Sequence, residues 1–189
     1  MHIALLHNPQ PTAPVASEPE DQYAECDSPQ TIQAIASALS VFGGVTPVAF
    51  DRRLPWRLEE GSFNFVFNIA EGEGRRSREA VPAAVCELLG LPYTGSDPVT
   101  LGLTLDKWLA RRTVSPDVAV ARAVFLNGTS GEECLRTLTY PVIVKPNDEG
   151  SSKGIRNKCF VKSTDELDGV VAELRGCVDG AQAAPADSQ

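Results

Sequence analysis

The sequence predicts an α/β protein in which a parallel sheet with crossover helices is followed by a smaller α+β unit. Three observations lead to this fold class. Short apolar runs and segments of helical periodicity follow one another through the first 113 residues, both ends of the first helix are marked, and the pattern begins again near Val114. We expect one domain over residues 1–113, a second over 114–176 and a disordered, polar tail over 177–189.

The composition is that of an ordinary globular protein without a broad basic surface. The chain has 189 residues, of which 42% are hydrophobic and 22% are charged, enough to bury a core. Its formal net charge of -8 argues against a nucleic acid or an anionic membrane as partner, so any anion site must be local. No apolar run approaches the roughly 20 residues of a membrane span, and no basic signal peptide opens the chain. These features predict a cytoplasmic protein.

The first domain is predicted to begin with a buried strand over residues 2–7 (HIALLH). A long acidic loop follows, until Ser28 and Pro29 open an amphipathic helix that closes at the glycine pair 43–44. Two further strands are expected over 45–50 and 63–68, and helices over 81–89 and 98–112. The stretch 91–95 (LPYTG) is too short for more than a strand stub or a turn.

The second unit shows shorter elements. Ser130 with Glu133, and Ser163 with Glu166, have the spacing of capping boxes and predict two helix starts. Strands are expected over 118–125, 142–145 and 158–161, with helices ending near Thr139 and Gly176.

The five cysteines are scattered and include no CxxC pair. This spacing favours reduced, mostly packing thiols over a disulfide framework or a metal site. We therefore predict no metal ligands.

Lys145 and the loop after it have the features of a phosphate site. The strand 142–144 fixes the backbone, so the Lys145 side chain projects from a defined position and its ammonium can bind a phosphate oxygen. The loop supplies close backbone approach and hydrogen-bond donors through Gly150, Ser151, Ser152 and Gly154. It is not a Walker A loop, because it runs into a strand and so forms a hairpin. The alternative is an ordinary Gly/Ser hairpin with surface lysines.

The polar stretch 71–78 (EGEGRRSR) follows the third predicted strand. Asn68 and Glu71 come at the carboxyl end of this strand, where open α/β sheets bind ligands. A glutamate here could pair with an ammonium group and an arginine could bind a carboxylate. The candidates are Glu71, Glu73 and Glu79 for the first role, and Arg75, Arg76 and Arg78 for the second. A solvated loop and a dinucleotide fingerprint, which lacks its third glycine, are the alternatives.

Three motifs together resemble the ATP-grasp ligases, specifically the D-alanine:D-alanine ligase group. They are FVFNIAEG (65–72), ELLGLPYTGSDPVTLGLTLDK (87–107) and YPVIVKPNDEGSSKGI (140–155), in that order. The resemblance implies a doubly wound, parallel-sheet pre-ATP-grasp domain followed by a partial α+β ATP-grasp subdomain.

The resemblance also implies roles for individual residues. Lys107 and Lys145 would contact ATP phosphates, together with the loop residues Gly150, Ser151, Ser152 and Gly154. Glu25, in the first loop, would hold the ammonium of the first amino acid, and Ser151 and Glu25 are the implied catalytic residues. Asn68, Glu71 and Arg78 complete the expected substrate site.

The reaction implied by the family joins two small amino acids through an acyl phosphate, with ATP and Mg²⁺ as cofactors. It would place the chain in peptidoglycan synthesis, with small molecules as partners and a homodimer as a compatible assembly.

Two departures from the family pattern bear on function. Many members carry a histidine and a Glu-Asp-Gly run where this chain has Asn68, Glu71 and RRSREA, which leaves the amino-acid substrate open. The family's metal-binding residues come from a stretch beyond the last recognisable helix, so we expect an incomplete ligase without its Mg²⁺ ligands. The alternatives are a catalytically silent nucleotide or amino-acid binding module and a plain dinucleotide-binding domain.

Overall fold

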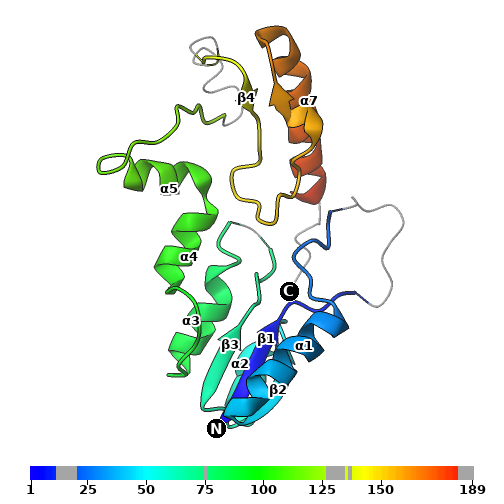
Figure 1. Ribbon diagram of the computed structural model, residues 1–189, viewed down its shortest axis with the longest axis vertical. Helices are drawn as coiled ribbons and strands as arrows, with labels where there is room; N and C mark the ends of the chain where they lie inside the picture. Colours follow the sequence, from blue (N-terminus) through cyan, green and yellow to red (C-terminus); the bar gives the residue numbers. More distant parts are fainter. Residues whose placement is uncertain (12–20, 75, 127–134, 136–137, 183–189) are drawn as a thin grey trace, which may run out of the picture. The chain divides into compact units, whose positions relative to one another are not determined.

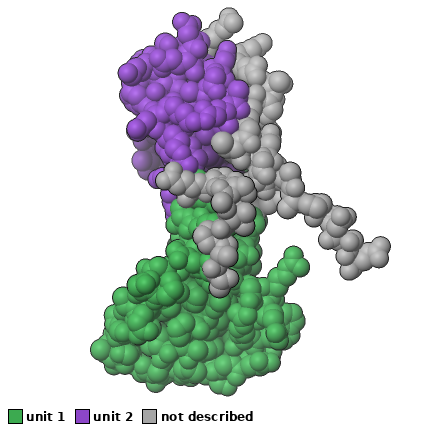
Figure 2. All heavy atoms as spheres, turned by 90° about the vertical axis from the view of Figure 1, so that its right-hand side faces the viewer, with its two compact units in different colours: residues 1–106 green, residues 107–189 purple. Residues whose placement is uncertain are grey.

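The protein forms two compact units, residues 1–106 and 107–189, which Figure 2 shows in different colours. A computed structural model describes residues 1–11, 21–74, 76–126, 135 and 138–182, with side chains described as far as 174. The division after Asp106 comes earlier than the predicted boundary at 113.

Unit 1 is built on a parallel sheet with β1 (His2–His7) at its centre. Strands β2 (Gly44–Ala49) and β3 (Phe65–Asn68) flank β1, and both pair with it in parallel (Figure 1). Tyr93, in the predicted LPYTG stub, adds a parallel bridge to Val66 of β3. The three strands and the stub predicted for this unit are therefore confirmed.

The core of unit 1 lies against one face of this sheet. Ala4 and Leu6 of β1 are fully buried there and pack with residues of β2, β3, α2 (Leu54–Glu60) and α3 (Ala80–Leu88). Helix α2 was not predicted. Its Leu54 and Leu58, four residues apart, are each 1% exposed, so burial of this short apolar face explains the helix.

Helix α1 (Pro29–Leu39) has the predicted start and contacts β1 and β2. The Ser28 side chain accepts a hydrogen bond from the Thr31 amide at 3.0 Å, which makes Ser28 the N-cap. A short 3₁₀ turn, Ser40–Phe42, follows the helix.

The single helix predicted over 98–112 is wrong, because the structure has two helices there. Helix α4 (Pro98–Leu105) ends at Asp106, whose ψ of 99° is extended, and α5 (Lys107–Val114) begins at the next residue. The buried Asp106 carboxylate accepts from Arg76 Nε and Nη2, both at 2.7 Å. This ion pair holds the break, which apolar periodicity alone does not indicate.

Unit 2 contains a short antiparallel pair and a long helix (Figure 1). Strand β4 (Val142–Ile143) pairs with β5 (Phe160–Val161), a 3₁₀ turn Asn157–Cys159 precedes β5, and α7 (Thr164–Gln182) follows. The predicted strand–loop–strand around Lys145 is confirmed, although both strands are shorter than expected.

Two other expectations for unit 2 are wrong. Residues 118–125 form no strand, and the Phe125 ring instead stacks on Trp108, with centroids 5.6 Å apart. Helix α7 continues past Gly176 to Gln182, so residues 177–182 belong to a helix rather than to the predicted tail. Residues 183–189, and most of the helix predicted from Ser130, lie outside the described residues.

No helix in the described part of the chain is both long and apolar enough to cross a bilayer. Cys26, Cys86 and Cys159, the cysteines whose side chains the structure describes, are free thiols.

Candidate functional site

Both lysines that were predicted to bind phosphate belong to unit 2, and Lys107 contacts the loop that follows Lys145. Lys145 follows β4, and its side chain is exposed. Lys107 is the first residue of α5, and its Nζ donates to the main-chain oxygens of Asn147 at 3.2 Å and Glu149 at 2.5 Å. The structure thus ties Lys107 to the segment that begins two residues after Lys145.

The loop from Gly150 to Gly154 is a compact turn with left-handed backbone. Ser151 and Ser152, both exposed, have φ of 44° and 60°, and Gly154 has φ of 74°. The Lys153 amide donates to the Gly150 oxygen at 2.9 Å, which closes the turn. A Cβ on Gly154 would lie 2.9 Å from Pro146 Cγ, so glycine is required by both conformation and space.

A Lys153–Glu149 ion pair at 3.2 Å spans the same loop. Cys159, fully buried, accepts from the Arg156 amide at 3.3 Å and lies 3.5 Å from the Gly154 oxygen. The loop is therefore held at its beginning by Lys107 and at its end by Cys159.

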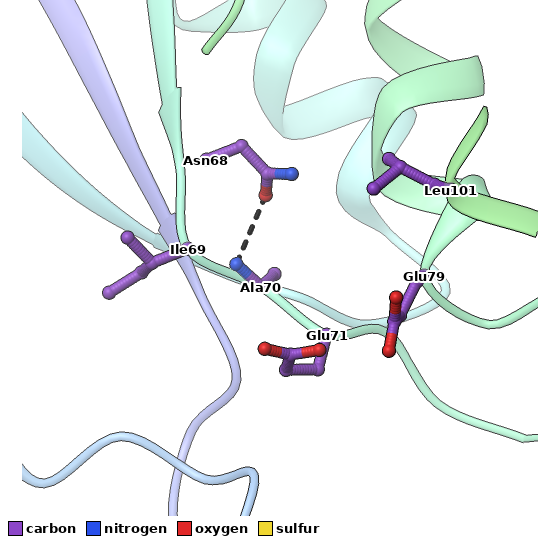
Figure 3. Close-up of a pocket in the computed structure, with 6 residues that line it drawn as sticks. All are labelled: Asn68, Ile69, Ala70, Glu71, Glu79 and Leu101. Carbon is purple, nitrogen blue, oxygen red and sulfur yellow. Dashed lines mark hydrogen bonds between the residues drawn. The ribbon is translucent and has the colours of Figure 1, made fainter. Parts of the chain in front are cut away.

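The predicted substrate residues belong to unit 1, at the carboxyl edge of its sheet. A pocket of about 200 Å³ is lined by Asn68, Ile69, Ala70, Glu71, Glu79 and Leu101 (Figure 3). Asn68 is the last residue of β3, and its Oδ1 accepts a hydrogen bond from the Ala70 amide at 3.1 Å. Two predicted residues, Asn68 and Glu71, thus line one pocket.

The two carboxyl groups of this pocket, Glu71 and Glu79, interact. Burial is the largest cause that raises the pKa of Glu71 from 4.5 to about 7, followed by the charges of Glu79 and Glu25. A hydrogen bond with Glu79 acts in the same direction, while the Arg78 charge opposes it. Near neutral pH the Glu71 carboxyl can therefore hold or release a proton, a property useful for binding an amine or for proton transfer.

Glu25 and Arg78, predicted separately as ammonium and carboxylate ligands, are paired with each other. Arg78 Nη2 donates to Glu25 Oε1 at 2.7 Å and Nε to Oε2 at 3.3 Å. The side chains are 5% and 8% exposed, and neither lines the pocket. Sequence reasoning selected both residues but not their mutual contact.

Asn8, which sequence reasoning missed, joins the ends of β1 and β3. Its Nδ2 donates to the Gly72 oxygen at 2.8 Å and its Oδ1 accepts from the Gly72 amide at 3.0 Å. The main chain of Asn8 also exchanges hydrogen bonds with Asp27, at 2.8 and 3.1 Å. An asparagine directly after a buried strand was the only sequence signal.

Glycine is required at position 72, where the Asn8 side chain binds the main chain of the loop before α3. Gly72 has φ of 72°, and a Cβ would lie 2.1 Å from the Arg78 main-chain oxygen. The glycine that resembled part of a dinucleotide fingerprint therefore has a packing role.

No group of three or more His, Cys, Asp or Glu side chains within the described ranges is arranged to hold a metal ion. The lysine loop, which comprises residues 145–154 together with Lys107, belongs to unit 2, and the acidic pocket belongs to unit 1.

No protein-family model matches the chain, but comparison with known proteins identifies relatives, several of which are named D-alanine–D-alanine ligase. A D-alanine–D-alanine ligase of Xylella fastidiosa is 30% identical over 125 residues, which are 63% of this chain and 41% of that protein. A ligase of the same name from Xanthomonas axonopodis is 34% identical over 102 residues, 49% of this chain and 31% of that protein. The chain thus spans less than half the length of the curated relatives it matches.

Solved structures show the same fold. The D-alanine–D-alanine ligase of Bacillus anthracis, complexed with ATP, superposes with a TM-score of 0.60 at 19% identity, covering 92% of this chain and 54% of that one. VanG D-Ala:D-Ser ligase from Enterococcus faecalis gives a TM-score of 0.59 at 21% identity, covering 92% and 58%. Taken with the sequence relatives, these likenesses confirm the predicted resemblance. The chain therefore resembles D-alanine–D-alanine ligases in sequence and in fold, and it spans part of the length of these relatives.

Proposed function

We propose that the chain binds ATP at the lysine loop of unit 2 and serves an ATP-dependent ligation of two small amino acids. The observation that carries this proposal is the attachment of Lys107 Nζ to the Asn147 and Glu149 oxygens, in the loop that follows Lys145. Two lysines and a Gly/Ser turn in one structure offer charge and donors to a polyphosphate. The ATP bound to the B. anthracis structure supports the same ligand class.

The two lysines and the serines of the turn each have a proposed role in binding ATP. Lys145, exposed after β4, binds a phosphate oxygen as a point charge. Lys107 exchanges a loop carbonyl for a phosphate oxygen when ATP enters, since an ammonium donates up to three hydrogen bonds. The turn from Gly150 to Gly154 presents the Ser151 and Ser152 hydroxyls, and Ser151 acts next to the transferred phosphoryl group.

Unit 1, proposed as a doubly wound pre-ATP-grasp domain, would bind the first amino acid at its acidic pocket. Asn68 and Glu71 line this pocket and supply an amide and a carboxyl. Glu25 and Arg78 form a charge pair complementary to the ammonium and carboxylate of a zwitterion. Binding to this pair requires the substrate to replace the contact between the two side chains.

The proposed reaction needs no protein nucleophile. A substrate carboxylate attacks the γ-phosphorus of ATP, which forms an acyl phosphate and releases ADP. The amine of the second amino acid then attacks the acyl carbon, forms the amide and expels phosphate. Positioning and charge stabilisation by the lysines account for the protein's part in the first step.

Mg²⁺, which the resemblance implies, finds no group of three or more His, Cys, Asp or Glu ligands among the described residues. Because the chain covers 41% of the X. fastidiosa ligase, the complete activity, a place in peptidoglycan synthesis and a cytoplasmic location are parts of the proposal.

A catalytically silent binding module is the second candidate. It is favoured by the Glu25–Arg78 contact, because the carboxylate proposed to hold an ammonium is already neutralised by an arginine. The two candidates make different predictions for turnover.

The test combines calorimetry with a phosphate-release assay in ATP and Mg²⁺. We expect saturable ATP binding by the purified chain, and phosphate release that depends on added D-alanine or D-serine. Binding without release would favour the silent module. Saturable binding of NAD with no response to ATP would contradict both candidates.

A further inference from the structure

Three hydrogen bonds converge on Asn147 from the start of α5. The main-chain oxygen of Asn147 accepts from the Lys107 amide at 3.0 Å and from Lys107 Nζ at 3.2 Å. Its side-chain Oδ1 accepts from the Trp108 amide at 2.9 Å. One residue of the loop therefore binds both the backbone and the ammonium of the lysine proposed to contact phosphate.

This arrangement is an N-cap supplied from a distant part of the chain. The first amides of a helix have no partner within it and need an external acceptor. The residue before α5, Asp106, accepts from Arg76 Nε and Nη2, and Asn147 takes the Lys107 and Trp108 amides. The position of the α5 N-terminus thus depends on a loop residue that lies 39 positions from Trp108.

The same loop holds the far end of the Lys107 side chain. Nζ contacts the Glu149 oxygen at 2.5 Å as well as the Asn147 oxygen. Glu149 in turn pairs with Lys153 at 3.2 Å, within the turn proposed to cover phosphates. A chain of contacts therefore runs from α5 through Asn147 and Glu149 to that turn.

We propose that Asn147 is a positioning residue that keeps Lys107 and the 149–154 turn in register for nucleotide binding. The proposal rests on the proposed ATP site. Asn147 acts through α5, because its side-chain oxygen is used by the Trp108 amide. Loss of this oxygen allows the start of α5 to move relative to the loop. Lys107 and the 149–154 turn can then no longer contact the same nucleotide together.

Two substitutions separate positioning from a general effect on stability. Asn147→Ala removes the acceptor for the Trp108 amide, whereas Asn147→Asp keeps an oxygen acceptor in a side chain of the same shape. Asn157→Ala provides the matched control, since Asn157 is an exposed asparagine of the same unit.

Hydrogen exchange and tryptophan emission give local readouts. The sequence has two tryptophans, so Trp56→Phe leaves Trp108 as the single emitter. In this background we expect Asn147→Ala to speed exchange of the Trp108 amide and of residues 149–154 by about tenfold, because one capping hydrogen bond is lost. Asn147→Asp restores slow exchange of the Trp108 amide, and Asn157→Ala leaves exchange and emission unchanged.

ATP titration then tests the link to the ligand. We expect Asn147→Ala to weaken ATP binding by about five- to tenfold and to abolish the change in Trp108 emission on ATP addition. An ATP affinity equal to that of the unaltered chain would overturn the proposal, even if the melting temperature falls. Absence of ATP binding by the unaltered chain would instead count against the ATP site. The exchange data would still decide the positioning role, which equal exchange rates in Asn147→Ala and the parent would overturn.

Discussion

Arg78 donates from Nε and Nη2 to the two carboxylate oxygens of Glu25, a residue 53 positions earlier in the chain. Both side chains are almost fully buried. The pair joins the loop before α1 to the segment before α3, so its charges matter for folding as well as for any substrate.

Breaking this buried pair should be costly. We expect Arg78→Ala to lower the free energy of unfolding by about 3 kcal/mol, because it leaves the Glu25 carboxylate buried without its cation. Denaturant titration measures the change. The double variant Glu25→Gln with Arg78→Met should recover part of the loss, since it buries no charge.

The half-exposed Asp51–Arg57 pair of the same unit is the matched control. Arg57→Gln should cost less than about 1 kcal/mol. Equal losses of unfolding free energy for Arg57→Gln and Arg78→Ala would show that the buried Glu25–Arg78 pair contributes no more to stability than the half-exposed pair.

Lys145→Ala should weaken ATP binding by at least about tenfold, because one charge-assisted contact to phosphate is lost. Its exposed position predicts an unchanged melting temperature. Lys162→Ala, at another exposed lysine of unit 2, is the control for net charge. Isothermal calorimetry compares the three proteins, and equal affinities would place the phosphate site elsewhere.

Glu71→Gln should change how stability depends on pH. The folded-state pKa of Glu71 is raised from 4.5 to about 7, so the folded protein binds more protons than the unfolded chain between these values. Stability conferred by the protonated carboxyl is therefore lost as pH rises through about 7. The neutral glutamine avoids this loss.

We expect Glu71→Gln to stabilise unit 1 by about 1 kcal/mol near pH 8 relative to its effect near pH 5, after allowance for solvent screening of a half-buried group. Urea melts across this range measure the difference. A stability difference that does not vary with pH would mean that Glu71 titrates normally.

Gly72→Ala should destabilise the protein more than Gly90→Ala. Both glycines have positive φ, 72° and 65°, so both variants carry a similar backbone strain of about 1 kcal/mol. At Gly72 the new Cβ would also lie 2.1 Å from the Arg78 oxygen, whereas at Gly90 the space is open. Thermal melts of the two variants should differ by several degrees, and matching melts would refute the packing role of Gly72.

Local signals in the sequence predicted most elements of unit 1. The cap at Ser28 with Pro29, and the apolar run 2–7, are short-range features that tertiary contacts reinforce. Helix α2 was missed because its seven residues show only two buried leucines. The break at Asp106 was missed because it depends on Arg76, a partner 30 positions earlier.

The candidate sites show the same limit. Residue type and position selected Lys145, Asn68 and Glu71, because each stands next to a strand end or a glycine-rich loop. Lys107 was selected only through the resemblance of its motif to the ligases. The partners of these residues could not be predicted, since Asn147 and Asn8 act through contacts 39 and 64 positions away. An isolated asparagine gives no sequence signal for such a contact.

The double contact between Asn8 and Asp27 has a practical consequence for protein engineering. The chain leaves the sheet at Asn8 and returns to it at Asp27, where the Asp27 amide donates to the Asn8 main-chain oxygen at 2.8 Å and the Asn8 amide donates to Asp27 Oδ2 at 3.1 Å. Extra residues placed between 9 and 24 would lengthen a segment whose ends are already fastened, and each doubling of loop length costs only about 0.6 kcal/mol. This segment is therefore a suitable place to graft a peptide epitope or a fluorescent reporter without disturbing β1 and α1, which it connects.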